Sequence, residues 1–212
     1  CFYFPEFYQI NTKTKKVNLD CNINSQHKIL SQVDNSIIIF FGRLPLYLNR
    51  VYFDNEEGGK EPDDWDNLFV STKENLTIQE TFKTEVLKLA QKNKIILIYP
   101  FPEAGWDIPK KILSLSKNDK KSIKEYLIPK NYITTSHDVY KKRAASSFEL
   151  LNSIKGKNIH RIFPDKLFCN TEFKNRCLTH DDKHIFYTDD SHPSSRAGEM
   201  INDLIMQKIK SN

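Results

Sequence analysis

The feature of this sequence that most constrains its fold is the alternation of short apolar runs with longer amphipathic ones. Three runs are rich in β-branched and aromatic side chains and predict strands: Ser36–Phe41, Lys94–Tyr99 and Asn158–Phe163. Short continuous apolar runs are typical of strands buried on both faces. Because helical segments separate the runs, we expect a parallel sheet with helices on both faces, a three-layer α/β/α fold. Sites in such sheets form at the carboxyl ends of the strands.

The segments around these strands carry helix and loop signals. Thr77-Ile-Gln-Glu80 has the spacing of a capping box, and Ser136 can cap a helix that Gly156 ends. The stretch from Leu44 to Asn67 is polar and rich in turn residues, which indicates an excursion or flap. His184–Tyr187 predicts a further short strand. The last helix carries apolar residues at three- and four-residue spacing: Ala197, Met200, Ile201, Leu204 and Ile205.

The composition fits one soluble globular domain over residues 1–212. Hydrophobic residues are 39% and charged residues 28%, which is too apolar for a disordered chain. The longest apolar runs are far short of the ~20 residues that a membrane helix needs. The net charge is +5, but no dense block of Lys and Arg interleaves with aromatics. We therefore expect no nucleic-acid partner.

The chain begins at Cys1, without a methionine or a signal peptide, which predicts a processed product or a fragment. Its four cysteines form two spaced pairs, Cys1 with Cys21 and Cys169 with Cys177. Four cysteines permit three pairings, and the two loop-enclosing pairs are the simplest. Metal binding is the rival interpretation, yet there is no CxxC and no histidine at ligand spacing. Disulfides, and hence an oxidising compartment, are the expectation; we expect no metal and no cofactor.

The most informative stretch is Tyr187–Gly198, between an apolar run and the last helix. Asp189 precedes His192 by three residues. A carboxylate at that spacing on a tight turn can bind one imidazole nitrogen and fix the tautomer, while the other nitrogen faces a nucleophile. This pair is two-thirds of a serine-hydrolase triad. Many surface loops contain Asp and His by chance, so the motif gains weight only from its place before an amphipathic C-terminal helix.

These residues resemble the SGNH (GDSL-like) hydrolases, whose Asp-x-x-His lies near the chain end in this context. More specifically, the chain is similar to the periplasmic SGNH domains fused to bacterial membrane O-acyltransferases of family 3. Four stretches match in order: Gly42–Tyr47, Pro100–Pro109, Tyr140 with Arg143, and the cysteine pair followed by Tyr187, Asp189, His192, Ser194 and Ala197-Gly198. The resemblance runs from Cys1 to the last helix.

The resemblance implies an SGNH-hydrolase-like (flavodoxin-like) fold and a periplasmic domain tethered to the inner membrane. It implies acyl-serine chemistry in which His192 is the base and Asp189 orients it. An acyl donor delivered by a fused membrane domain would pass its acetyl group to an envelope glycan. Gly42, Arg43 and Tyr47 are candidates for oxyanion or substrate binding; Arg43 is equally consistent with a surface arginine, and Gly42 with a simple turn.

One departure from the family pattern bears on activity. The family nucleophile lies in a Gly-Asp-Ser-His turn after the first strand, and this sequence has no such turn. We therefore expect that the first strand is missing and that these residues alone are inactive. Two alternatives stay open: a free-standing secreted carbohydrate esterase, and a non-catalytic glycan-binding domain.

Other chemistry-bearing residues have a structural explanation beside the functional one. Ser194 and Ser195 next to His192 are expected to be helix caps rather than nucleophiles, and Ser191 is equally weak as a nucleophile. Glu103 and Asp107 have the residue types of a glycosidase pair, but that spacing is common by chance. The aromatic residues that are candidates to stack on a sugar or to pack are Tyr47, Trp65 and Trp106.

Overall fold

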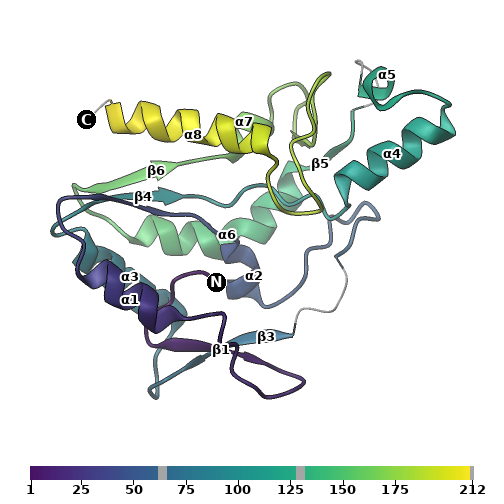
Figure 1. Cartoon of the computed structure of the whole chain (residues 1–212). Helices are drawn as coiled ribbons and strands as arrows, with labels where there is room; N and C mark the ends of the chain where they lie inside the picture. The colour runs from purple at the N-terminus through teal and green to yellow at the C-terminus, as the bar shows by residue number, and fades with distance from the viewer. Residues whose placement is uncertain (62–65, 128–131, 211–212) are drawn as a thin grey trace. The chain divides into compact units, whose positions relative to one another are not determined.

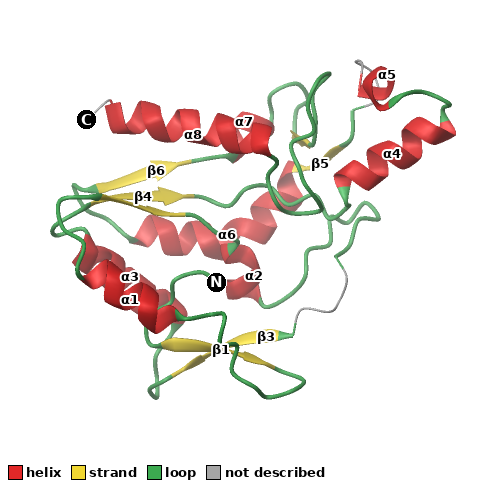
Figure 2. Ribbon diagram, in the orientation of Figure 1, coloured by secondary structure: helices red, strands yellow, loops and turns green. Residues whose placement is uncertain are grey.

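The computed structural model describes residues 1–61, 66–127 and 132–210 (Figures 1 and 2). Among these residues the elements in chain order are β1 (Phe7–Asn11), α1 (Ile23–Ser31), β2 (Ile37–Phe40), α2 (Leu44–Asn49), β3 (Asn67–Ser71), α3 (Ile78–Leu89), β4 (Lys94–Ile98), α4 (Ile108–Asn118), α5 (Ile123–Leu127), β5 (Thr134–Ser136), α6 (His137–Ser153), β6 (Ile159–Ile162), α7 (Asp165–Phe168), β7 (Arg176–Leu178) and α8 (Ser195–Lys210).

The chain divides into two compact units. The first, here the sheet unit, comprises Cys1–Val51, Asp63–Tyr99 and Ala145–Arg161. The second, here the loop unit, comprises Tyr52–Pro62, Pro100–Ala144 and Ile162–Asn212. That residues 1–212 form a single domain stays a prediction.

The sheet unit is built on three strands in the order β2-β4-β6, with β2 and β4 parallel. The middle strand is buried on both faces: Ile95, Ile96 and Leu97 have no exposed surface. That burial explains why its sequence is continuously apolar instead of alternating. β2 borders β4 alone among the described strands and alternates, with Ile38 and Phe40 buried. A separate antiparallel ribbon pairs β1 with β3.

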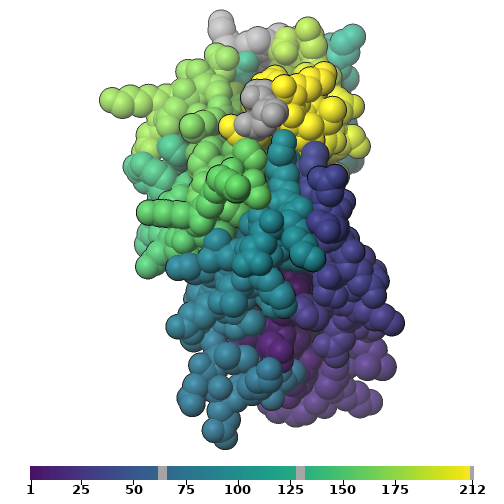
Figure 3. All heavy atoms as spheres, turned by 90° about the vertical axis from the view of Figure 1, so that its left-hand side faces the viewer, coloured from purple at the N-terminus to yellow at the C-terminus, as the bar shows by residue number. Residues whose placement is uncertain are grey.

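An aromatic cluster holds α3 and the N-terminal segment against β2. Phe82 on α3 has no exposed surface, and its ring centroid lies 5.4 Å from that of Phe40 and 5.3 Å from that of Phe2. Figure 3 shows the purple N-terminal residues recessed between the surfaces of α1 and α3. α3 begins where the sequence predicts, because the Thr77 hydroxyl accepts from the Glu80 N–H and caps the helix. The predicted start of this helix at Thr77 is therefore confirmed.

The loop unit has less regular structure and a core of aromatic rings. The Phe101 ring centroid lies 5.2 Å from Phe168 and 4.9 Å from Tyr187. β5 and β7 pair antiparallel beside the Cys169–Cys177 disulfide. α8 buries the predicted apolar stripe through Ala197, Ile201 and Ile205.

Most of the predicted elements are confirmed, with small corrections. The three strand runs become β2, β4 and β6, and the helix capped by Ser136 becomes α6. α6 ends at Ser153, so Gly156 is not its C′ residue. His184–Tyr187 is not a strand: its backbone makes only the isolated bridges His180–Ile185 and Tyr187–Pro193. The Leu44–Asn67 excursion starts with α2, and Trp65 lies outside the described residues.

The cysteine prediction is also confirmed. Cys1 bonds to Cys21, and Cys169 bonds to Cys177, so each disulfide encloses a loop. Within the described ranges no helix is both long and apolar enough to cross a membrane.

Candidate active site

The Asp-x-x-His segment forms a tight loop closed at its base. Tyr187 and Pro193 form a bridge, and the Thr188 N–H donates to the His192 carbonyl at 3.0 Å. Tyr187 itself is buried, and its hydroxyl donates to the Pro102 carbonyl at 2.8 Å. Ser194 ends the loop: its hydroxyl accepts from the Ala197 N–H and so begins α8. The loop is thus anchored on both sides by buried contacts.

Within this loop the structure brings Asp189 and His192 together. One Asp189 oxygen, Oδ1, accepts from the N–H groups of Ser191 and His192, each at 2.8 Å. The other, Oδ2, lies 2.7 Å from His192 Nδ1. An ionised carboxylate can only accept, so Nδ1 carries the proton and Nε2 is left as the basic nitrogen. This is the tautomer that a general base needs.

The environment of the pair keeps the acid ionised and the base accessible. Burial acts to raise the pKa of Asp189, but the N–H groups of Ser191 and His192 and the imidazole outweigh it, so the pKa lies below its usual value. The His192 side chain is 67% exposed. An external hydroxyl can therefore reach Nε2.

A second Asp-Asp-x-His segment lies eight residues earlier and was not singled out from the sequence. Asp181 Oδ1 accepts from the N–H groups of Lys183 and His184, as Asp189 Oδ1 does in its own turn. The imidazole contact is weaker, because His184 Nδ1 lies 3.4 Å from Asp181 Oδ2. The repeated DDxH spacing was a signal that could have found it. This pair is a natural internal control for the first.

The other candidates, Gly42, Arg43 and Tyr47, lie in the sheet unit where β2 ends and α2 begins. A Cβ on Gly42 would meet the Phe2 ring, so close packing favours a residue without a side chain there. Tyr47 packs edge-on to Phe69, with ring centroids 5.4 Å apart, and burial raises its pKa. Tyr47 is thus better explained by packing than by sugar stacking.

Two sequence motifs noted separately turn out to bind one another. On α6, the Tyr140 hydroxyl donates to the Pro100 carbonyl, and Arg143 Nε donates to Glu103 at 2.8 Å. Both members of the Arg143–Glu103 pair are buried. Asp107 caps α4 through the Lys110 N–H. Glu103 and Asp107 therefore have structural roles, and the glycosidase interpretation loses its support.

No serine beside His192 is placed to act as the nucleophile. The Ser191 hydroxyl is buried, and the Ser194 hydroxyl donates to the Ile185 carbonyl at 2.7 Å. Ser195 is the first residue of α8. The predicted helix cap is therefore confirmed for Ser194, whereas Ser195 lies inside the helix as its first residue. Over residues 1–61, 66–127 and 132–210, no three His, Cys, Asp or Glu side chains group as metal ligands would.

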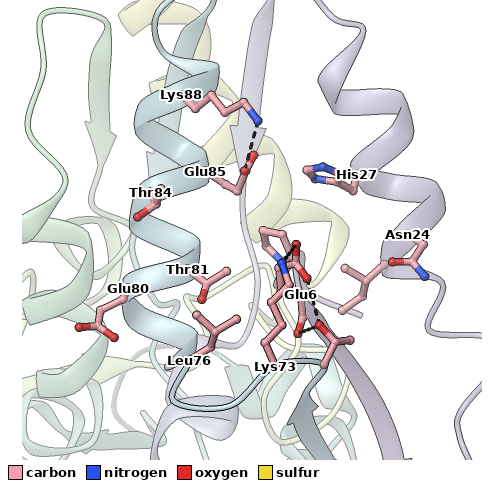
Figure 4. A pocket seen from close by; sticks show the side chains of 13 residues that line it. Glu6, Asn24, His27, Lys73, Leu76, Glu80, Thr81, Thr84, Glu85 and Lys88 are labelled. Carbon is pink, nitrogen blue, oxygen red and sulfur yellow. Dashed lines mark hydrogen bonds and ion pairs between the residues drawn. The ribbon is translucent and has the colours of Figure 1, made fainter.

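The sheet unit also carries a polar pocket of about 440 Å³ between α1 and α3 (Figure 4). Asn24 and His27 enter it from α1, and Glu85 and Lys88 from α3. Its charges largely neutralise one another, as Lys88 lies 3.5 Å from Glu85. His27 Nδ1 is also engaged, by the Tyr3 hydroxyl at 2.7 Å. Nothing in this lining resembles an acid–base pair.

A parallel sheet with flanking helices and an Asp-His turn before the last helix defines an SGNH-hydrolase-like α/β protein. Residues 1–207 match the family model described as the SGNH domain fused to AT3 domains, and the chain belongs to that family. Among solved structures it is similar to a Salmonella ser. Paratyphi A lipopolysaccharide acetyltransferase periplasmic domain. The TM-score is 0.55 at 18% identity, over 97% of this chain and 69% of that one. No curated protein matches the sequence significantly.

Proposed function

We propose that this SGNH domain is the acyl-transfer part of a polypeptide that also carries a membrane AT3 domain, and that it O-acetylates a glycan of the cell envelope. The observation that carries the proposal is the bond between His192 Nδ1 and Asp189 Oδ2 at 2.7 Å, in a histidine whose side chain is 67% exposed. Membership of the AT3-fused family supports the membrane partner and a periplasmic location.

The chemistry follows from the tautomer. A serine hydroxyl attacks the acetyl carbonyl of the donor while His192 Nε2 takes its proton, and the imidazolium then protonates the departing group. A sugar hydroxyl next gives its proton to Nε2 and attacks the acyl-serine, whose oxygen recovers the proton as the C–O bond breaks. Asp189 stays ionised and stabilises the imidazolium in both steps. If water replaces the sugar, the same groups carry out ester hydrolysis.

The nucleophile is proposed to be a serine outside these 212 residues, on a strand that pairs with the edge of β2. The sequence contains no Gly-Asp-Ser turn. In β2, Ile37 and Ile39 are 42% and 45% exposed, and β4 is its one partner among the described strands. Another parallel strand there would end beside Gly42, at the carboxyl edge where such sites form. Gly42 and Arg43 are proposed to bind the oxyanion or the substrate at that edge.

A serine-reactive fluorophosphonate applied to the complete polypeptide tests this proposal. We expect one labelled serine, located by mass spectrometry outside Cys1–Asn212, with labelling lost in His192→Ala and kept in His184→Ala. Residues 1–212 alone should not turn over a chromogenic acetyl ester.

Two results would contradict the proposal. One is ester turnover by the 212 residues that His192→Ala abolishes. The other is a complete polypeptide that binds glycan but takes no label, which would favour the non-catalytic binding domain.

A further inference from the structure

Asn55 is a fully buried polar side chain in the loop unit that no sequence motif singles out. Its Oδ1 accepts from the N–H groups of Glu57 and Gly59 at 2.9 and 2.8 Å, and so shapes its own turn. Its Nδ2 donates to the Ala104 carbonyl at 2.7 Å. One side chain therefore both closes the turn and ties it to the loop that follows β4.

The two backbones meet at glycines. A Cβ on Gly105 would lie 2.7 Å from the Gly59 carbonyl oxygen, and a Cβ on Gly59 would lie 2.8 Å from Trp106 Nε1. Real Cβ contacts under 3.0 Å essentially never occur. Gly105 also has φ +74°, which favours glycine. The Asn55 turn and the loop are thus closely packed at Gly59 and Gly105.

The loop that follows β4 also forms backbone hydrogen bonds to the Asp-His turn. The N–H groups of Ala104 and Gly105 donate to the Asp190 carbonyl at 2.8 and 3.1 Å. The Ile108 N–H donates to the Asp189 carbonyl at 3.1 Å. The Ala104 carbonyl therefore accepts from Asn55, while the Ala104 N–H donates to the Asp190 carbonyl. Hydrogen bonds in such a chain polarise and orient one another.

We propose that Asn55 is a positioning residue for the Asp189–His192 pair. Through Ala104 it fixes the backbone of the turn, and the turn fixes the Asp189 carboxylate and with it the tautomer of His192. Asn55 touches neither side chain of the pair. The importance of this role rests on the proposed acyl transfer, but the geometry can be tested without any activity.

Asn55→Asp separates the two functions of the side chain. The retained oxygen still accepts from Glu57 and Gly59, while the new oxygen faces the Ala104 carbonyl and cannot donate to it when ionised. Imidazole ¹⁵N spectra of the 212-residue chain, recorded at alkaline pH, report the tautomer of His192. We expect the ratio of Nδ1–H to Nε2–H to fall by about twofold to thirtyfold. The pKa of Asp189, followed by its ¹³Cγ shift, should rise toward the usual value.

Asn93→Ala is the matched control, since Asn93 is also buried and uses all parts of its amide. Its Oδ1 accepts from the Ser36 N–H, and its Nδ2 donates to the carbonyls of Val33 and Leu89. It lies in the sheet unit, at the amino ends of β2 and β4. Asn93→Ala should lower the thermal midpoint without moving the His192 tautomer. His184 is the internal reference in the same spectra.

The proposal is overturned if folded Asn55→Asp keeps the wild-type tautomer and Asp189 pKa, or if Asn93→Ala moves them equally. If Asn55→Asp does not fold, the wild-type titration decides. The NMR signals of the Asn55 side-chain amide and the Ala104 N–H must then shift with the same midpoint as the Asp189 titration. If they do not, the proposal is overturned as well. Loss of the proposed acyl transfer would change none of these readouts, so the two failures can be told apart.

Discussion

Asp189 uses both carboxylate oxygens, one on two backbone N–H groups and one on an imidazole. The comparison with Asp181 shows how little the sequence motif says by itself. Both aspartates form the same turn, yet the imidazole distance is 2.7 Å in one and 3.4 Å in the other. The difference lies in the surroundings, because the Ala104–Ile108 segment supports only the Asp189 turn in the hydrogen bonds described above.

The stability of the chain should depend on Asp189 in a pH-specific way. Its pKa is lowered in the folded state, so the unfolded chain binds the proton first as the pH falls. The stabilisation is fully present above the unfolded pKa of about 3.9 and is lost as the pH falls through the lower folded value. Asp189→Asn should therefore reduce the urea midpoint at pH 7, and the difference from wild type should vanish at strongly acidic pH. A difference that is independent of pH would contradict the ionised pair.

At the scale of single elements, periodicity and capping residues predict the long and regular parts well. β4 is buried on both faces and α3 presents one apolar face, so their residue patterns carry the information. The ribbons β1–β3 and β5–β7 were missed, since their strands mix polar with apolar residues and lack the continuous apolar run of β4. His184–Tyr187 was wrongly predicted as a strand because its apolar residues are buried by loop packing: the Phe186 ring packs at a tilt against Phe168, with centroids 5.1 Å apart.

The residues of the candidate site were also only partly predictable from the sequence. The Asp189–His192 pair was found because its spacing is local and its chemistry is encoded in two residue types. Asn55 could not be found, because its role depends on Ala104, a residue 49 positions away. Only the folded chain brings those two loops together.

The capping box of α3 offers a test at this scale. Thr77 accepts from the Glu80 N–H, and its hydroxyl donates to the Glu80 carboxylate at 2.7 Å. Thr77→Ala removes both bonds and should lower the free energy of unfolding by about 1 kcal/mol. Thr77→Ser keeps the hydroxyl and should recover most of the loss. Equal losses in the two variants, measured by urea unfolding, would mean that the hydroxyl does not cap the helix.

For the molecule as a whole, the exposed edge of β2 is the region where we expect aggregation to begin. Ile37, Ile39 and Phe41 are each about two-fifths exposed. An apolar edge strand with free backbone groups is a template for pairing with another chain. We therefore expect the isolated 212 residues to self-associate at this edge.

Ile39→Lys should reduce that association, because a charge on an edge strand opposes strand pairing. Leu113→Lys on α4 is the matched control: Leu113 is 39% exposed, close to the 45% of Ile39, but lies on a helix of the loop unit. Sedimentation velocity measures the degree of self-association of each variant. If both substitutions reduce association equally, general surface hydrophobicity is the cause and the edge has no special role.

The central claim is that His192, oriented by Asp189, is the base of an acyl-transfer site, and O-acetylation of the envelope glycan by the complete polypeptide measures it most directly. His192→Ala and His184→Ala remove chemically identical side chains from two like turns of the same loop unit. The account predicts that His192→Ala lowers the transfer rate by about 10³-fold or more, while His184→Ala leaves it near wild type. Equal rates in the two variants, or a larger loss in His184→Ala, would contradict it.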